Sequence, residues 1–153
     1  MPPSLYSAIS IFDSIAEKFN IGYRPMIAIS RDTGGAVTRS ALATTEYVEP
    51  GSIFPFLLIG NNLPNYAIGY IIKIMRYIND GLVQIGGNKS RGGFGFITFS
   101  KLSLEISDYK DGKLKAIDDL DKEITIDLPK DSEGKDFFVK TKPLEEVFNN
   151  AKI

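Results

Sequence analysis

The chain has 153 residues, of which 43% are hydrophobic and 24% are charged, and its formal net charge is −1. This length and composition predict one globular domain with a core of its own and exclude a disordered or fibrous chain. The sequence has no cysteine and no histidine. Disulfides, thiolate metal sites and every catalytic mechanism that depends on histidine are therefore excluded.

The distribution of charge says more than its sum. Residues 1–100 hold eight Lys and Arg against six Asp and Glu, whereas residues 101–153 hold ten against thirteen. Any nucleic-acid site is then local and not a broad basic surface. No apolar run approaches the roughly 20 residues of a membrane span, and no signal peptide is recognisable. We expect a cytoplasmic protein with no membrane partner.

The first half of the chain alternates apolar segments with polar, glycine-containing ones. Apolar residues at helical spacing predict an amphipathic helix over residues 4–19. Residues 25–30 and 41–48 are expected to be strands, separated by a polar excursion at residues 31–40.

The next elements follow in close order. Residues 53–59 form a nearly continuous apolar run that predicts a buried strand, although Pro55 cannot donate to a ladder. A second helix is expected over residues 65–79 and a strand over residues 94–100. The resulting order is that of a ferredoxin-like plait that lacks its first strand, an α+β fold.

The remainder predicts further strands and turns. Residues 102–106 alternate, Asp111-Gly112 is a hairpin turn signal, residues 124–126 are expected to be extended, and residues 144–148 are expected to form a short helix. We therefore predict a core at residues 1–100 and a β-rich extension of the same domain at residues 101–153.

A glycine-rich basic loop precedes the strand expected at residues 94–100. Glycine lets backbone N–H groups approach a phosphate closely, and two cations lie within the cluster. The strand would present Phe94 and Phe96 on one face, where they could stack on bases. The spacing matches neither a Walker loop nor a dinucleotide-binding fingerprint. The residues expected to contact RNA here are Gly86, Gly87, Lys89, Ser90, Arg91, Gly92, Gly93, Phe94 and Phe96.

The polar excursion at residues 31–40 is a second candidate. Arg31 and Arg39 would meet phosphates if this segment leaned over a nucleic-acid strand, with Thr33 beside them. The alternative is a solvated hairpin. Four carboxylates cluster in the tail, but their spacing matches no calcium loop, and a solvated acidic turn is the simpler interpretation. We predict no metal ligand, cofactor or catalytic residue.

Several segments resemble the RAMP superfamily of CRISPR-associated proteins, especially the backbone subunit of type III effector complexes. Residues 31–36, Arg-Asp-Thr-Gly-Gly-Ala, resemble the family's D-R-x-T-G-x-A segment. Residues 46–54 resemble its E-x-V-x-x-G-x-x-F continuation, and residues 86–95 resemble its G-G-x-x-S-R-G-x-G loop. Residues 3–5 faintly resemble the opening of the family's first helix.

This resemblance implies a ferredoxin-like protein that binds guide RNA along its backbone, with a β-hairpin thumb at about residues 31–48. It also implies assembly with target RNA, further effector subunits and copies of itself in antiviral defence. The family's first strand and its cleaving aspartate would precede Pro3, so no catalytic residue carries over. We expect a neighbouring chain to supply the missing strand.

Other interpretations remain open. Residues 93–99 and 57–63 resemble the two sequence motifs of the RNA recognition motif, in which case the chain would be a stand-alone single-stranded RNA binder. An RNA recognition motif, however, needs a helix and a strand after residue 100. An assembly-only split RAMP subunit and a metal-dependent ribonuclease are further alternatives.

Overall fold

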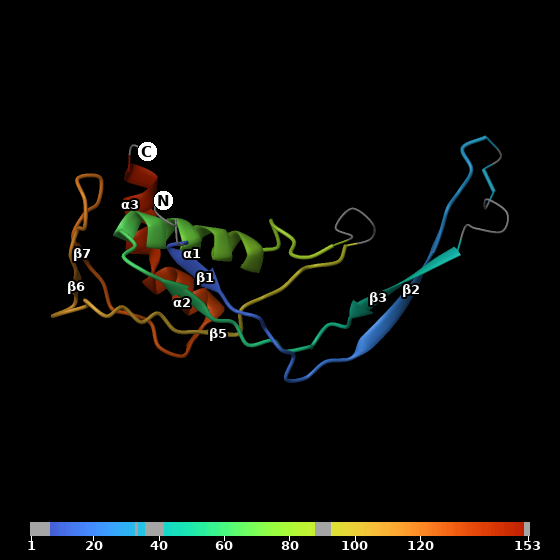
Figure 1. The fold of residues 1–153 in the computed structure, drawn as a ribbon, viewed down its shortest axis with the longest axis horizontal. Helices are drawn as coiled ribbons and strands as arrows, with labels where there is room; N and C mark the ends of the chain where they lie inside the picture. The colour runs from blue at the N-terminus through green and yellow to red at the C-terminus, as the bar shows by residue number, and fades with distance from the viewer. Residues whose placement is uncertain (1–6, 33, 36–41, 88–92, 152–153) are drawn as a thin grey trace, which may run out of the picture. The chain divides into compact units, whose positions relative to one another are not determined.

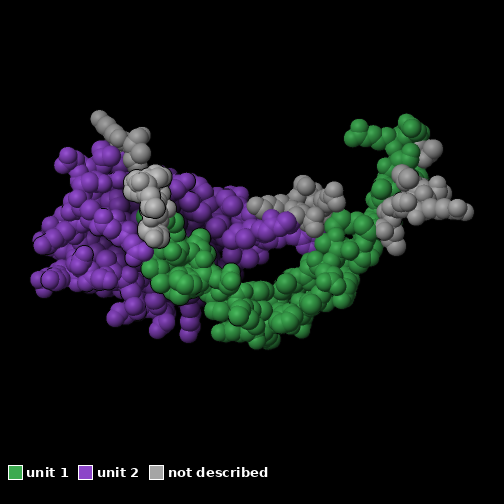
Figure 2. All heavy atoms as spheres, viewed as in Figure 1, with its two compact units in different colours: residues 1–60 green, residues 61–153 purple. Residues whose placement is uncertain are grey.

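The computed structural model describes residues 7–32, 34–35, 42–87 and 93–151. Within them the chain forms three helices and eight short strands, and the strands pair as two-stranded antiparallel sheets (Figure 1). The residues divide into two compact units, 1–60 and 61–153, which Figure 2 shows in different colours. The mixed α and β composition agrees with the α+β prediction. The ferredoxin-like arrangement and the domain boundary at residue 100 stay predictions.

The first unit begins with a long backbone pairing. β1 (Ile9–Ile11) pairs antiparallel with β4 (Leu58–Gly60). Beyond the strands, the Phe12 N–H donates to the Leu57 carbonyl at 3.1 Å, and the Ile53 N–H donates to the Lys18 carbonyl at 2.7 Å. Residues 9–18 therefore run extended beside residues 53–60.

The helix predicted over residues 4–19 is therefore wrong for its described part, residues 7–19. Its β-branched residues Ile9, Ile11 and Ile15 favour extended backbone, and pairing with a distant segment overrides the local helical spacing. The strand predicted at residues 53–59 is shorter than expected, because Pro55 lies between the isolated pairing at Ile53 and the ladder at β4.

The second sheet of this unit is a hairpin. β2 (Ile21–Ile27) and β3 (Leu42–Val48) pair over seven residues each, from Ile21 opposite Val48 to Ile27 opposite Leu42, and lie side by side in Figure 1. The strand predicted at residues 41–48 is confirmed over its described part. The one predicted at residues 25–30 begins earlier and ends at Ile27.

The second unit is organised around helix α1 (Asn65–Asn79), which confirms the helix predicted there. It packs against α3 (Lys142–Asn150). A further helix, α2 (Gly134–Lys140), directly precedes α3 in the chain. The predicted helix at 144–148 is confirmed within α3, whereas α2 was not foreseen. The buried core residues come from helices and strands alike: Ile72, Leu102, Leu114, Ile126, Phe137, Phe138 and Leu144.

A close approach of backbone to backbone joins the two packed helices. Gly69 of α1 faces Leu144 of α3 so closely that a Cβ on the glycine would lie 2.0 Å from the Leu144 carbonyl oxygen. Beside this contact, the Arg76 guanidinium donates to both carboxylate oxygens of the buried Glu145, at 3.0 and 3.2 Å. The carboxylate raises the pKa of Arg76 above its ordinary value, mainly through these hydrogen bonds.

Short strands complete the unit. β5 (Lys101–Leu102) pairs with β8 (Ser132–Glu133), and β6 (Lys113–Leu114) pairs with β7 (Ile124–Thr125). The predicted turn is confirmed, because Asp111 and Gly112 both have positive φ, +53° and +78°, directly before β6. The tail is less β-rich than expected, since only Leu102 of the predicted strand at 102–106 lies in a strand.

No strand is present at residues 94–100, so that prediction is wrong. Gly95 has φ of +85°, in the left-handed region that interrupts an extended strand. Among the helices of the described residues, none has the length and apolar character that a membrane crossing would require.

Candidate nucleic-acid interface

A hydrogen bond closes the base of the glycine loop. The Ile85 N–H donates to the Gly95 carbonyl oxygen at 2.8 Å, which joins the two stems on either side of the glycine-rich segment. A Cβ at position 95 would lie 2.0 Å from the Ile85 carbonyl oxygen, and φ is positive there. Only glycine allows the stems to approach this closely, so Gly95 is a positioning residue that the sequence analysis did not single out.

The first residues of the loop are open to a ligand. Gly86 has φ of +93°, and a Cβ placed on Gly86 or Gly87 would meet no atom of the described residues within 4 Å. A bulky partner such as a phosphate could therefore reach the backbone at these positions. The predicted contacts Lys89, Ser90, Arg91 and Gly92 lie outside the described residues, and their role stays a prediction.

The aromatic residues after the loop do not alternate as in a strand. Phe94 is half-buried, whereas Phe96 is 56% exposed. A Cβ on Gly81 or on Gly93 would lie 3.7 Å from the Phe96 ring. The ring therefore lies over two glycines, one at the end of α1 and one in the loop, and keeps much of its surface accessible.

Both stems are anchored to the end of α1. The N–H groups of Asp80 and Leu82 donate to carbonyls of the last helical turn, each at 2.9 Å. The Asn79 side-chain oxygen accepts the Phe99 N–H at 2.9 Å. Asn79 was not foreseen, because its side chain binds a residue 20 positions further along the chain. The helix thus anchors both stems.

The predicted residues of the polar excursion belong to the other unit. Arg31 is exposed in the connection between β2 and β3, where the Gly34 N–H donates to the Ser30 carbonyl at 3.0 Å. Thr33 and Arg39 lie outside the described residues. The RNA contacts of this connection stay a prediction.

The hairpin exposes an apolar face. Ile21, Tyr23 and Ile27 alternate along β2 and therefore point to the same side of the ribbon, and all three are exposed. On the other side, Gly22 is buried beneath the Tyr47 ring, which leaves no room for a Cβ. An isolated two-stranded ribbon of this kind is marginally stable in water, which favours a partner on the apolar face.

The carboxylates of the tail have structural partners. The buried Asp121 accepts the N–H groups of Asn65, Ile117 and Lys122, at 2.9 to 3.1 Å, so it caps the N-terminus of α1 from a distant part of the chain. The predicted solvated turn is therefore wrong at this position.

Asp118 closes its own turn and also binds a helix residue. Its carboxylate accepts the N–H groups of Leu120 and Asp121, each at 2.9 Å, and the Tyr66 hydroxyl at 3.1 Å. The last contact raises the pKa of Tyr66 above its ordinary value. These carboxylate oxygens are engaged by N–H and O–H donors of the fold.

The described part of the site is thus a pair of joined stems, anchored to α1, on either side of a glycine-rich basic segment in a mixed α and β chain. Glycine N–H groups at such a position are suited to backbone contact with a polyanion. The family model of the RAMP superfamily matches residues 3–98. The chain belongs to the RAMP superfamily, and it is in general terms a CRISPR-associated RNA-binding subunit. None of the curated proteins matches it.

Proposed function

We propose that the chain is a structural subunit of a type III-like CRISPR effector complex that contacts the backbone of the guide RNA through its glycine loop. The observation that carries the proposal is the loop itself, closed by the bond between Ile85 and Gly95 within the segment that the family model covers. Lys89, Ser90, Arg91 and the neighbouring glycine N–H groups would hold phosphates.

The hairpin has the role of a thumb in this proposal. Arg31, Thr33 and Arg39 follow β2 and would contact the RNA where guide and target pair. The apolar face along Ile21, Tyr23 and Ile27 would pack on a neighbouring copy or another effector subunit. No catalytic role is proposed for the chain.

A neighbouring chain would also complete the first sheet. β1 and β4 form a two-stranded sheet in the described residues, and two strands are too few for independent stability. Addition of a strand from another subunit would satisfy an open edge. Sedimentation of the full chain at high concentration tests this point, and a well-dispersed monomer would contradict it.

RNA binding against salt concentration tests the proposal as a whole. The double variant Lys89→Ala, Arg91→Ala should bind a single-stranded oligoribonucleotide more weakly. Its slope of log K against log salt should be flatter by roughly 1.4, because each phosphate contact on a single strand contributes about 0.7.

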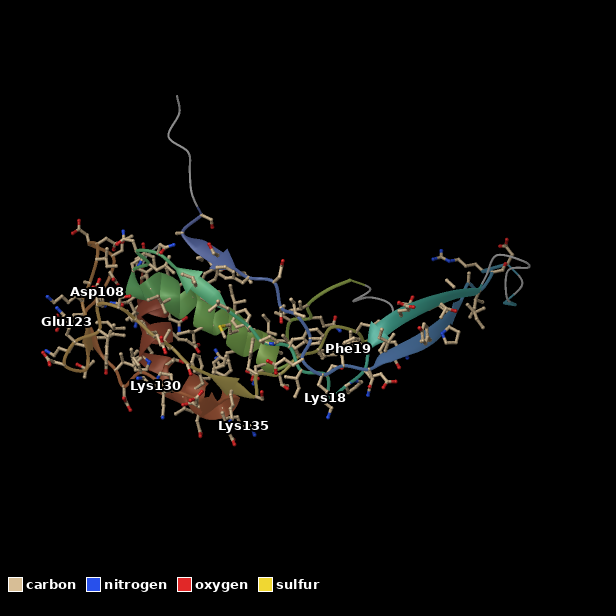
Figure 3. All side chains as sticks on the ribbon, turned by 60° about the horizontal axis from the view of Figure 1, so that its bottom comes forward. Lys18, Phe19, Asp108, Glu123, Lys130 and Lys135 are labelled. Carbon is tan, nitrogen blue, oxygen red and sulfur yellow. The ribbon has the colours of Figure 1, made fainter. Side chains whose placement is uncertain are left out.

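A matched control removes two exposed lysines of the tail, Lys110→Ala with Lys130→Ala; Lys130 is labelled in Figure 3. The control has the same change of net charge but should keep the wild-type slope. Equal slopes for both double variants would contradict the assignment of phosphate contacts to the loop. A wild-type chain that binds no RNA at low salt would overturn the proposed function.

A further inference from the structure

An exposed apolar surface adjoins the glycine loop, and apart from Phe96 none of its residues has been given a role above. It consists of side chains from the segment after α1 and from the stem after the loop. Each is at least 40% exposed, and Leu82 reaches 71%. We call it the post-helix surface, and its residues are Leu82, Val83, Ile85, Phe96 and Ile97.

Two contacts bring together the two segments that carry these residues. The Phe96 ring lies against Gly81, the residue before Leu82, because a Cβ there would be 3.7 Å from the ring. The bond between Ile85 and Gly95 joins the two stems directly behind it. The N–H groups of Leu82 and Val83 both donate to the Tyr77 carbonyl, at 2.9 and 3.3 Å, so the turn that carries them is fixed to the helix.

The sequence that carries the post-helix surface favours a polyanion over a protein. Between Asp80 and Glu105 it contains three cations, Lys89, Arg91 and Lys101, but neither aspartate nor glutamate. The rest of the tail, from Glu105 onward, is acidic in sum. A single strand of RNA offers phosphates to such a segment and offers flat, weakly polar bases to apolar side chains beside it.

We infer that the post-helix surface takes the bases of the RNA strand whose phosphates the glycine loop holds, with Leu82 and Val83 as base contacts beside the Phe96 ring. The inference rests on the proposed function and extends it to the turn after α1. Apolar side chains that protrude from a fixed backbone can insert between bases, while an exposed ring can stack on one. A nucleotide would thus be bound at two points, its phosphate by the loop and its base by the post-helix surface.

The test compares Leu82→Ala with a matched control, Val139→Ala. Val139 lies in α2 and is 72% exposed, so both variants remove an exposed apolar side chain. We expect Leu82→Ala to weaken the binding of a fluorescent oligouridylate about fivefold to tenfold, a typical loss for one apolar base contact, while Val139→Ala has no effect. The slope of log K against log salt should stay at the wild-type value, because no phosphate contact is lost.

A second probe separates base contacts from any indirect effect on the loop. On an oligoribonucleotide with abasic positions, Leu82→Ala and wild type should bind equally, since the bases are absent. Leu82→Phe should bind oligouridylate at least as tightly as wild type, because a ring stacks on bases. Equal urea unfolding of all variants confirms that they fold alike.

Three results would overturn the inference. The first is wild-type affinity of Leu82→Ala for oligouridylate, and the second is an equal loss on both probes. The third is reduced self-association in sedimentation with unchanged RNA affinity, which would assign the post-helix surface to a second copy of the chain. In each case the loop variant Lys89→Ala, Arg91→Ala can still show weaker RNA binding, so the proposed function is judged separately.

Discussion

Gly95→Ala tests the closure of the glycine loop. At φ of +85° an alanine costs about 1–2 kcal/mol relative to glycine. Its Cβ would lie 2.0 Å from the Ile85 carbonyl oxygen, where ordinary contacts begin at 3.4 Å. The stems must therefore separate, and the hydrogen bond between them contributes about 0.5–1.5 kcal/mol. We expect the free energy of unfolding to fall by about 2–3 kcal/mol.

Gly112→Ala is the matched control. Gly112 has a similar φ, +78°, but a Cβ there would meet no atom within 4 Å. It should cost only the conformational part, about 1–2 kcal/mol, and leave RNA affinity unchanged. Urea unfolding and fluorescence anisotropy with a single-stranded oligoribonucleotide measure both quantities. If Gly95→Ala were no more destabilising than Gly112→Ala and bound RNA as tightly, the close approach of the stems would have no role.

Three further predictions concern the fold that supports the loop. Gly69→Ala should lower the free energy of unfolding in urea by about 1–3 kcal/mol, because its Cβ would overlap the Leu144 carbonyl and push α3 away from α1. An unchanged urea midpoint would contradict the close packing of the two helices. Asp121→Ala should cost about 1–3 kcal/mol, since three N–H groups lose their acceptor, and loss of helical circular dichroism at a lower urea concentration measures this. Asp118→Asn should return the pKa of Tyr66 toward its ordinary value of 10.0 in an ultraviolet titration read against Tyr66→Phe, because the carboxylate raises it. The stability from this pair is present below that ordinary pKa and is lost as the pH rises through the raised one, so a pH-independent difference between wild type and Asp118→Asn would refute it.

Elements with strong local signals could be predicted from the sequence. α1 carries an apolar stripe with proline before its first turn, and Asp111-Gly112 has the residue types that positive φ requires. In both cases neighbouring residues decide the conformation. The same holds for α3, whose helical spacing is visible in the sequence.

Elements decided by distant partners could not be predicted. Residues 9–18 have apolar residues that fit a helix, but their backbone groups pair with residues 53–60, which no local pattern reveals. The stem at Gly95 was expected to be a strand, because alternation of phenylalanine and glycine cannot show that the glycine has positive φ. The cap from Asp121 to α1 joins residues 56 positions apart.

The candidate site divides in the same way. The glycine cluster and its cations are visible as composition, so the loop could be located in advance. The residues that position the stems are Asn79, which contacts Phe99, and Gly95, which contacts Ile85. The spacing of residues in the sequence does not reveal such contacts. The post-helix surface could not be predicted, because the sequence does not show that its apolar side chains stay exposed in the folded chain.

Crosslinking tests the central claim most directly. The full chain would be bound at low salt to a single-stranded RNA that contains 4-thiouridine, irradiated, digested and analysed by mass spectrometry. Crosslinked peptides are predicted from residues 81–99, and they should disappear in the double variant Lys89→Ala, Arg91→Ala. Crosslinks confined to residues 101–151, or the same crosslinks in the double variant, would contradict RNA contact through the glycine loop.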